Sequence, residues 1–407
     1  MTTPSFQQFL LPQDNPRLQL ARNNTLADYA AHMLATDKAQ NLKAQWQRML
    51  EETFTGITSN GEVIPYLYPL DDEGFEVEQA VAAAQQLVSG LTEAQQEKIR
   101  YPLDSSAWRA WYNPEIPFNE LGLRLEQSSA GSQSAFLALL RSCTSERGAQ
   151  KVQQLMDANH FLGELYDITH IMNRWSFHFL LFGEPSMTRP WGWSIYGHHV
   201  AFCCLIVGRQ LVIAPTFMGV EPNVIARGNA NDCTLFTAEE QAGLALMQSL
   251  RPSQQETATI FHDMEDPQMP PERFNFADQR HLAGAFQDNR VIPLEGICAA
   301  EFSATQQRAL MTLIAIFLEF LPDGPRAARL ALIERHLDQT WWSWIGGSDD
   351  EDVFYFRIQS PVVLLEFDHH SGMWLTNQHP ERFHIHTITR LPNGNDYGKA
   401  LLKQLTP

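Results

Sequence analysis

Two histidines stand one residue apart in ERFHIHTITRLPNG, the segment from residue 381 to 394. Its alternating pattern predicts a β-strand, in which His384 and His386 share one face and Ile385 takes the other. Their Cβ atoms would lie roughly 6.6 Å apart, so both imidazoles could bind one ion at about 2.0–2.1 Å. The alternative is a pair of solvated histidines on an exposed strand face.

The strand predicted just before this segment carries two carboxylates in the run LLEFD. Glu366 and Asp368 would lie on the same face of that strand. If the two strands pair, two imidazoles and one carboxylate could surround a metal ion and leave open coordination positions. We expect Glu366 to be a fourth ligand or to orient one of the ligands.

A third imidazole could come from the segment YGHHV, which contains His198 and His199. On a strand their side chains would point to opposite faces, so at most one of them would join the site. Gly197 would allow the backbone to approach closely there. The alternative is one core histidine bonded to the backbone and one exposed histidine.

A possible general base lies in DANHFLGEL, residues 157 to 165. His160 and Glu164 are four residues apart on a predicted helix and therefore share one face. A glutamate oriented by histidine near a metal-bound water could accept its proton. The alternative is a buried pair that ties this helix to a neighbour.

Arg357, in the predicted strand YFRIQ, is the candidate for anion recognition. Its guanidinium could hold a substrate carboxylate with two parallel hydrogen bonds. It could equally pair with Glu366 or Asp368 in a structural ion pair.

The other histidines are weaker candidates. His369, His370 and His379 fall in segments predicted to be loops, which makes them second choices. Six more have no partner at a useful spacing: His32, His170, His178, His262, His281 and His336.

The elements that must position these residues predict an α+β fold. We expect a helical N-terminal region and a mainly antiparallel sheet, built from two distant β-regions and covered by helices. The first β-region (191–219) reads as a hairpin that turns at Gly208, and Ser360-Pro361 bends or splits the second. The predicted domains are an N-terminal helical extension (1–64) and one large domain (65–405). That domain would be helical over 65–185 and 237–340, with a β-hairpin over 190–219 and strands over 353–391.

Composition excludes several classes of protein. The 407 residues carry a net charge of −18, with 47 acidic against 29 basic side chains. This balance disfavours nucleic acid and anionic membrane surfaces as partners. Five cysteines without a CxxC spacing indicate free thiols in a reducing compartment. The N-terminus has no secretory signal pattern and the longest apolar run is too short to span a bilayer, so a cytoplasmic location is expected.

Familiar catalytic motifs are missing from the sequence. It contains no G-x-S-x-G, no HExxH and no glycine-rich phosphate loop after a strand. A serine hydrolase, a zincin or a nucleotide-dependent enzyme therefore has no motif to support it.

Several segments together resemble the domain-of-unknown-function family 3500 (DUF3500). They are DSSAWRAWYNPE, NHFLGEL, PWGWSIYGHHVAF, APTFMGVEP, FYFRIQSPVVLLEFD and HIHTITRLPNGNDYG. The resemblance covers roughly residues 65 to 405; its final turn reads Asp396-Tyr397-Gly398, where the family more often has phenylalanine in the middle. In the family a strand with tyrosine and arginine and a later glutamate precede the final histidine pair, an order that Arg357 and Glu366 match here. The resemblance implies that the GHH and HIH blocks belong to one domain, and it implies no activity.

These observations favour a cytoplasmic metal-dependent enzyme that acts on a small polar or carboxylated molecule. A divalent zinc, manganese or iron ion would be held by His198 or His199 with His384 and His386, and hydrolysis by metal-bound water is the expected chemistry. A non-haem iron oxygenase is the first alternative. The second is a non-catalytic ligand-binding protein with structural histidines. No oligomeric state is predicted.

Overall fold

A computed structural model describes residues 5–228, 230 and 232–405, so residues 1–4 of the predicted N-terminal extension lie outside the described part. The described residues form twelve α-helices around one large mixed sheet, with a separate pair of short strands.

Twelve α-helices of the described chain lie outside the two predicted β-regions. They are α1 (Pro16–Asn23), α2 (Leu26–Leu34), α3 (Asp37–Glu51), α4 (Val77–Ser89), α5 (Glu93–Ile99), α6 (Ala130–Cys143), α7 (Glu146–Tyr166), α8 (Thr237–Ser249), α9 (Pro252–Ala258), α10 (Ala304–Phe317), α11 (Asp323–Glu334) and α12 (Lys399–Leu405).

The strands range from two to eleven residues in length. They are β1 (Arg100–Tyr101), β2 (Leu123–Arg124), β3 (Phe177–Phe182), β4 (Trp191–Gly197), β5 (Val200–Val207), β6 (Gln210–Val220), β7 (Val224–Ile225), β8 (Cys233–Thr234), β9 (Thr259–Phe261), β10 (Ile297–Cys298), β11 (Trp341–Gly346), β12 (Phe354–Gln359), β13 (Leu364–His370) and β14 (Glu381–Arg390).

The large sheet has twelve strands in the order β1-β3-β4-β5-β6-β14-β13-β12-β11-β10, with β2 beside β3 and β9 beside β11. Most pairs are antiparallel, as predicted, but β1 runs parallel to β3 and β9 parallel to β11. The expectation that two distant β-regions build the whole sheet was therefore wrong. The strand β3 was missed because FHFLLF is buried along its whole length and shows no polar alternation.

The two predicted β-regions meet in the middle of the sheet, where β6 pairs with β14. In this register His386 lies opposite Gly219, and on its other side His386 lies opposite Asp368 of β13. The predicted break at Ser360-Pro361 is confirmed, since it separates the antiparallel strands β12 and β13.

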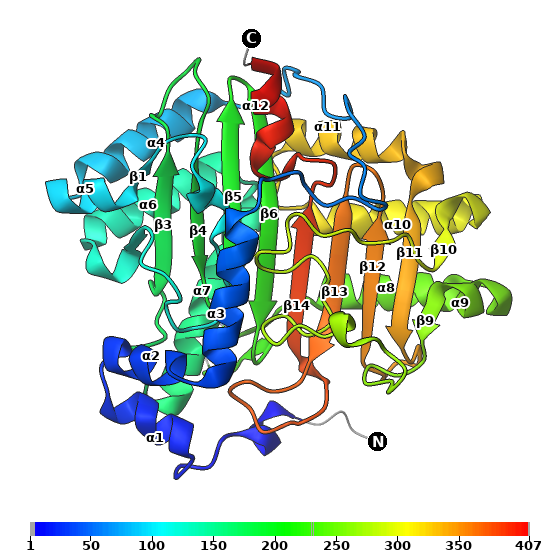
Figure 1. The fold of residues 1–407 in the computed structure, drawn as a ribbon, viewed down its shortest axis with the longest axis horizontal. Helices are drawn as coiled ribbons and strands as arrows, with labels where there is room; N and C mark the ends of the chain where they lie inside the picture. The colour runs from blue at the N-terminus through cyan, green and yellow to red at the C-terminus, as the bar shows by residue number, and fades with distance from the viewer. Residues whose placement is uncertain (1–4, 229, 231, 406–407) are drawn as a thin grey trace.

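The two faces of the sheet differ in polarity. On the back face, Phe356 and Phe367 stack with ring centroids 5.1 Å apart, and Phe317 of α10 packs against Phe356. On the front face the central strands carry carboxylates and imidazoles. The segment 262–296 and α3 cross in front of the sheet, whereas α8 and α10 cross behind it (Figure 1).

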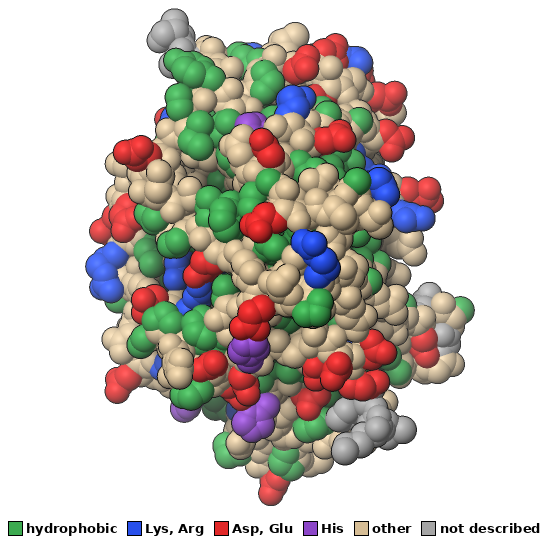
Figure 2. All heavy atoms as spheres, turned by 90° about the vertical axis from the view of Figure 1, so that its right-hand side faces the viewer, with side chains coloured by type: hydrophobic (Ala, Val, Ile, Leu, Met, Phe, Trp, Pro, Cys, Tyr) green, Lys and Arg blue, Asp and Glu red, His purple; other side chains and the backbone are tan. Residues whose placement is uncertain are grey.

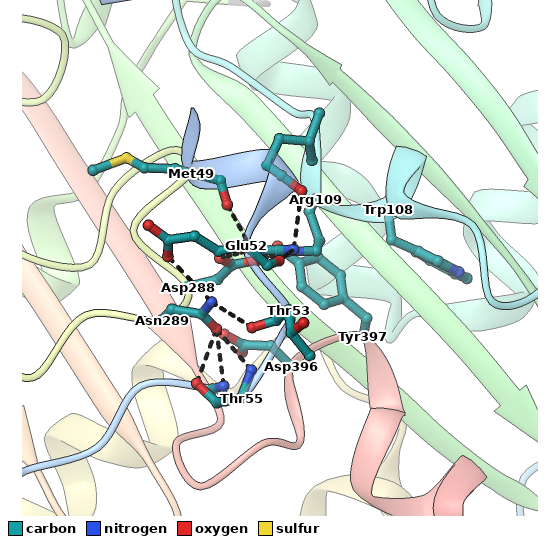
Figure 3. A network of polar contacts seen from close by, with 12 residues as sticks. Met49, Glu52, Thr53, Thr55, Trp108, Arg109, Asp288, Asn289, Asp396 and Tyr397 are labelled. Atoms are coloured by element: carbon teal, nitrogen blue, oxygen red, sulfur yellow. Dashed lines mark hydrogen bonds and ion pairs between the residues drawn. The ribbon is translucent and has the colours of Figure 1, made fainter. Parts of the chain in front are cut away.

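A buried polar network holds the N-terminal helices on the front face (Figure 3). Arg109 forms a two-bond ion pair with Asp288, at 2.7 and 3.0 Å, and donates hydrogen bonds to the carbonyls of Met49 and Glu52. The hydroxyl of Tyr397 donates to the same carboxylate at 3.2 Å. These contacts join the end of α3 to residues 262–296, called the front segment below, and to the C-terminal turn that contains Tyr397.

The surface reflects the acidic composition. Acidic side chains are spread over the face that includes α9 and the β9–β11 edge (Figure 2). In the described part of the chain, every helix is too short or too polar to traverse a lipid bilayer.

Candidate metal centre

His384 and His386 lie on the front face of β14, as their spacing predicts, and both are buried. The Nδ1 atom of His384 donates to the Ser371 carbonyl at 2.8 Å, because a carbonyl can only accept. In the neutral ring Nε2 then carries a lone pair, and it lies 3.2 Å from Nε2 of His386. Two nitrogens bound to one tetrahedral ion at 2.0–2.1 Å would be about 3.3–3.4 Å apart. The pair is therefore spaced for one ion.

His199 brings a third imidazole from the turn between β4 and β5. Its ring centroid lies 5.4 Å from that of His384 and 5.1 Å from that of His386. The candidate ligand nitrogens of the three residues all lie within 4.8 Å of one another. The backbone of His199 is fixed on both sides, since its N–H donates to Asn113 Oδ1 at 3.0 Å and its carbonyl accepts from Gly219 at 2.8 Å.

His198 lies beside His199, with ring centroids 3.9 Å apart. The expectation that the two side chains point to opposite faces was wrong, because these residues form a two-residue turn with His199 at φ +65°. Nδ1 of His198 lies 2.9 Å from Oδ1 of Asn159, whose own amide donates to the Asn173 carbonyl at 2.7 Å. This arrangement places the His198 proton on Nδ1 and leaves Nε2 without one.

Gly219 makes the convergence of these rings possible. A Cβ atom at this position would lie 2.6 Å from Cδ2 of His386 and 3.0 Å from Cδ2 of His199. No side chain fits there without moving an imidazole. Nothing in the sequence around Gly219 distinguishes it from other strand glycines, so its role was not predicted.

A second set of candidate ligands lies behind the first and consists of Asp368, His370 and His386. The carboxylate of Asp368 is placed between two imidazoles, with Nε2 of His281 at 3.2 Å and Nε2 of His370 at 3.0 Å. The ring centroids of His370 and His386 lie 3.8 Å apart. His370 was predicted to be in a loop, but β13 extends to it through an irregular register after His369.

Several buried polar atoms of this second set and of the neighbouring His281 have no hydrogen-bond partner among the described residues. They are Oδ1 of Asp368, Nε2 of His370, Nδ1 of His386 and both ring nitrogens of His281. The Nε2 atoms of His281 and His370 thus lie close to the Asp368 carboxylate but are poorly aligned for hydrogen bonds with it. Buried groups left unsatisfied in this way are rare in proteins and are consistent with a site for an ion.

His281 was not predicted to take part. It lies on the front segment 262–296, far along the chain from Asp368, and no local spacing indicates the contact. Only the packing of that segment on the sheet brings it there.

The buried position of the cluster controls its ionisation. Burial lowers the pKa of His370 to about 4 and holds the pKa values of His199 and His386 well below the usual range. Burial also opposes protonation of His281, but the charge of Asp368 raises its pKa to about 9. His199, His370 and His386 are therefore neutral at pH 7, which is the form that binds metal ions.

Glu366 lies on the predicted face but is fully occupied by donors. Oε1 accepts from the Leu282 N–H at 2.8 Å and from the Tyr355 hydroxyl at 2.6 Å, and Oε2 accepts from the Ala283 N–H at 2.8 Å. It belongs to neither candidate ligand set. Its contacts anchor the front segment to the sheet.

Arg357 anchors the same segment. Its guanidinium binds Glu295 at 2.8 Å and the Pro293 carbonyl at 3.2 Å, and the side chain is buried. Its partner is therefore neither of the carboxylates expected from the sequence, and it does not line the cavity described below.

His160 and Glu164 lie on α7 but apart from this cluster, at partly exposed positions. They approach each other at 3.4 Å, Glu164 binds Arg227 at 2.7 Å, and both side chains are more than one third exposed. They line a separate open depression of about 1070 Å³, whose lining residues include none of the clustered imidazoles. The structure does not bring this pair to the candidate metal centre.

A cavity of about 320 Å³ leads to the first ligand set. Its walls include Met33 and Leu42 from the N-terminal helices and Phe118 and Phe276 from the rest of the chain. Four buried imidazoles also line it: His198, His199, His384 and His386.

Other polar groups also line the cavity, and two of them, Arg17 and Glu115, form an ion pair. Glu115 accepts from Arg17 at 2.7 Å and from the Tyr29 hydroxyl at 2.8 Å. Arg17 also donates to the Met373 carbonyl and lies over the Trp374 ring. These contacts connect α1 and α2 to the wall of the cavity.

The family described as "Protein of unknown function (DUF3500)" has a sequence model that matches residues 73–399. The chain belongs to the DUF3500 family. No curated protein and no solved structure matches it. The DUF3500 match includes every candidate ligand of both sets. It begins after α3, so the N-terminal helices that wall one side of the cavity lie outside it.

Proposed function

We propose that this protein is a metal-dependent hydrolase whose ion is held by His199, His384 and His386. One observation carries the proposal. Three imidazoles with ligand atoms within 4.8 Å of one another line a cavity that is large enough for a small molecule.

The donor set fits a divalent ion. Three neutral nitrogen ligands leave at least one coordination position open, which suits zinc, manganese or iron. The carbonyl of Ser371 sets the tautomer of His384, as the partners of metal-bound histidines commonly do. Such an ion supplies two things when bound: it lowers the pKa of a coordinated water and polarises a carbonyl oxygen.

His198 is the residue best placed to accept a proton in this cavity. Its Nδ1 proton is committed to Asn159, and the free Nε2 belongs to a ring that lies beside His199 and lines the cavity. A fixed acceptor next to the water that attacks the substrate is what general-base catalysis needs. Glu164 has no part in this proposal, because it lies in a different depression.

The cavity also narrows the class of substrate. Its walls are largely apolar. Two cationic side chains line it, but Arg17 is already paired with Glu115 and the Lys38 ammonium lies over the Phe276 ring. Arg357 is not among the residues that line this cavity, so it is not placed to bind a substrate carboxylate there. We propose an uncharged ester, lactone or amide with a compact apolar body.

The test begins with untagged protein purified without chelators. We expect about one or more equivalents of a transition metal per chain and hydrolysis of short uncharged esters, lactones or amides by the loaded protein. His199→Ala should abolish turnover, whereas His178→Asn, at a buried histidine outside the cavity, should retain it.

Three results would overturn the proposal. Oxygen uptake by the iron-loaded protein, without hydrolysis, would indicate a non-haem iron oxygenase. Metal below about a tenth of an equivalent would favour a non-catalytic binding protein with structural histidines. Hydrolysis that survives in His199→Ala would place the reaction elsewhere.

A further inference from the structure

The two nitrogens of His386 lie in different surroundings. Nε2 faces Nε2 of His384 at 3.2 Å, and both residues belong to the first ligand set. Nδ1 is buried and has no hydrogen-bond partner within the described part of the chain. An imidazole that uses only one nitrogen would leave a buried polar atom uncompensated.

The direction of Nδ1 follows from the packing of Gly219. The Cδ2 edge of His386 faces Gly219 on β6, since a Cβ atom there would lie 2.6 Å from it. Cδ2 and Nδ1 are bonded to opposite sides of Cγ, so Nδ1 faces away from β6. On that other side lies β13, where Asp368 is the cross-strand neighbour of His386.

The groups that Nδ1 faces are those of the second ligand set. Candidate ligand atoms of Asp368, His370 and His386 lie within 4.8 Å of one another, and all three residues are buried. Oδ1 of Asp368 and Nε2 of His370 also lack hydrogen-bond partners among the described residues. Two imidazoles and one carboxylate form a suitable donor set for a divalent transition metal ion.

We propose that His386 bridges two metal ions. Nε2 would bind the first ion together with His199 and His384, and Nδ1 would bind the second together with Asp368 and His370. The first ion is the one in the proposed function, on which this inference therefore rests. The second ion is inferred from the second ligand set alone.

The bridge has a simple proton balance. A neutral His386 ring bound through Nε2 keeps its one proton on Nδ1. When the second ion binds, a nitrogen–metal bond replaces that N–H bond and one proton passes to solvent. No group is oxidised or reduced. His281, 3.2 Å from the Asp368 carboxylate, would orient that ligand from the far side.

Metal counting tests the second site. Protein stripped with a chelator and reloaded with zinc should bind two ions per chain. His199→Ala and His370→Ala should each bind one, and the control His178→Asn should bind two. A wild-type chain that binds a single ion, and a His370→Ala variant that keeps the full count, are the results that would overturn the inference.

Copper(II) loading tests the bridge itself and needs no variant. Two copper ions joined by one imidazolate couple antiferromagnetically, so the integrated electron paramagnetic resonance signal should correspond to clearly fewer spins than bound copper ions. Two copper ions with a full signal would contradict the bridge. Failure of the proposed function would appear differently, as absence of turnover in protein that still binds two ions.

Discussion

At the scale of single residues, the site is built on His384 and His386, two buried imidazoles of β14. The alternation in HIH places His384 and His386 on one face whatever the rest of the fold does. Glu366 satisfied the same parity rule, yet its oxygens accept backbone N–H groups that only tertiary packing supplies. His281 could not be predicted, because its contact with Asp368 depends on the path of an irregular segment.

Gly219 provides a residue-scale prediction. In Gly219→Ala the new methyl group would displace the rings of His386 and His199, so zinc affinity should fall about 10–100-fold. The variant should also be destabilised by about 1–3 kcal/mol through overpacking. Competition with a chromophoric chelator and urea unfolding measure the two effects. Gly131→Ala on α6, where a Cβ atom meets nothing closer than 3.6 Å, should leave zinc affinity unchanged and should not destabilise the protein. Equal zinc affinity in both variants would contradict the packing argument.

His178 provides a prediction about acid stability. Burial, helped by the nearby Arg124 guanidinium, lowers the pKa of His178 to about 4. Between pH 6.5 and 4 the unfolded chain binds a proton that the folded chain does not, so stability falls as the pH falls. At pH 5 this one group should cost roughly 2 kcal/mol.

The measurement is the free energy of unfolding of chelator-treated protein at pH 7 and pH 5. His178→Asn keeps a donor for the Leu121 carbonyl, which His178 Nδ1 contacts at 2.9 Å, but cannot titrate. The drop in stability between the two pH values should therefore be smaller by roughly 2 kcal/mol in the variant. Identical drops would show that His178 is not buried in its neutral form.

At the scale of elements, regular alternation and turn residues predicted the strands that carry the site. The short strands at the edges of the sheet were not predicted. The break at Ser360-Pro361 and the pairing of β13 with β14 follow from local patterns. Two- and three-residue strands such as β1 and β9 leave no periodic signal, and they exist only because longer strands offer them partners. The turn at His198-His199 was missed for a related reason: a single glycine before two histidines does not distinguish a turn from a continuing strand.

Glu366 supplies the prediction for the front segment. Glu366→Gln turns one acceptor oxygen into a donor that faces backbone N–H groups, so the variant should lose about 2–3 kcal/mol of stability. Because Glu366 belongs to neither ligand set, the zinc count per folded chain should stay unchanged. Urea unfolding and metal analysis decide the matter, and loss of one zinc ion without loss of stability would restore Glu366 as a ligand.

At the scale of the whole molecule, the N-terminal helices complete a cavity that the DUF3500 match alone does not enclose. Arg17 holds them through Glu115, Tyr29 and the Met373 carbonyl. The sequence indicated helices there but nothing of their docking, since the partners of Arg17 lie far along the chain. The acidic composition disfavours nucleic acid and anionic membranes as partners, and the sequence has no familiar catalytic motif. Neither observation identifies a reaction.

Arg17→Ala tests this docking. Loss of the guanidinium leaves the Glu115 carboxylate, which is almost fully buried, without its cation, a change that commonly costs several kcal/mol. Amide hydrogen exchange over residues 16–51 should rise, while exchange in β6 and β14 stays slow. Arg48→Ala, at an exposed position on α3, is the matched control. Unchanged protection in Arg17→Ala would mean that the N-terminal helices are held by apolar contacts alone.

The proposed function requires that His199, His384 and His386 bind a metal ion. Anomalous diffraction from crystals of the zinc-loaded protein, collected on both sides of the zinc edge, would locate this ion. We expect a peak about 2.0–2.1 Å from a ring nitrogen of each of the three histidines. A map with no peak among these imidazoles, or with zinc only at surface groups such as His160 and Glu164, would contradict this proposal.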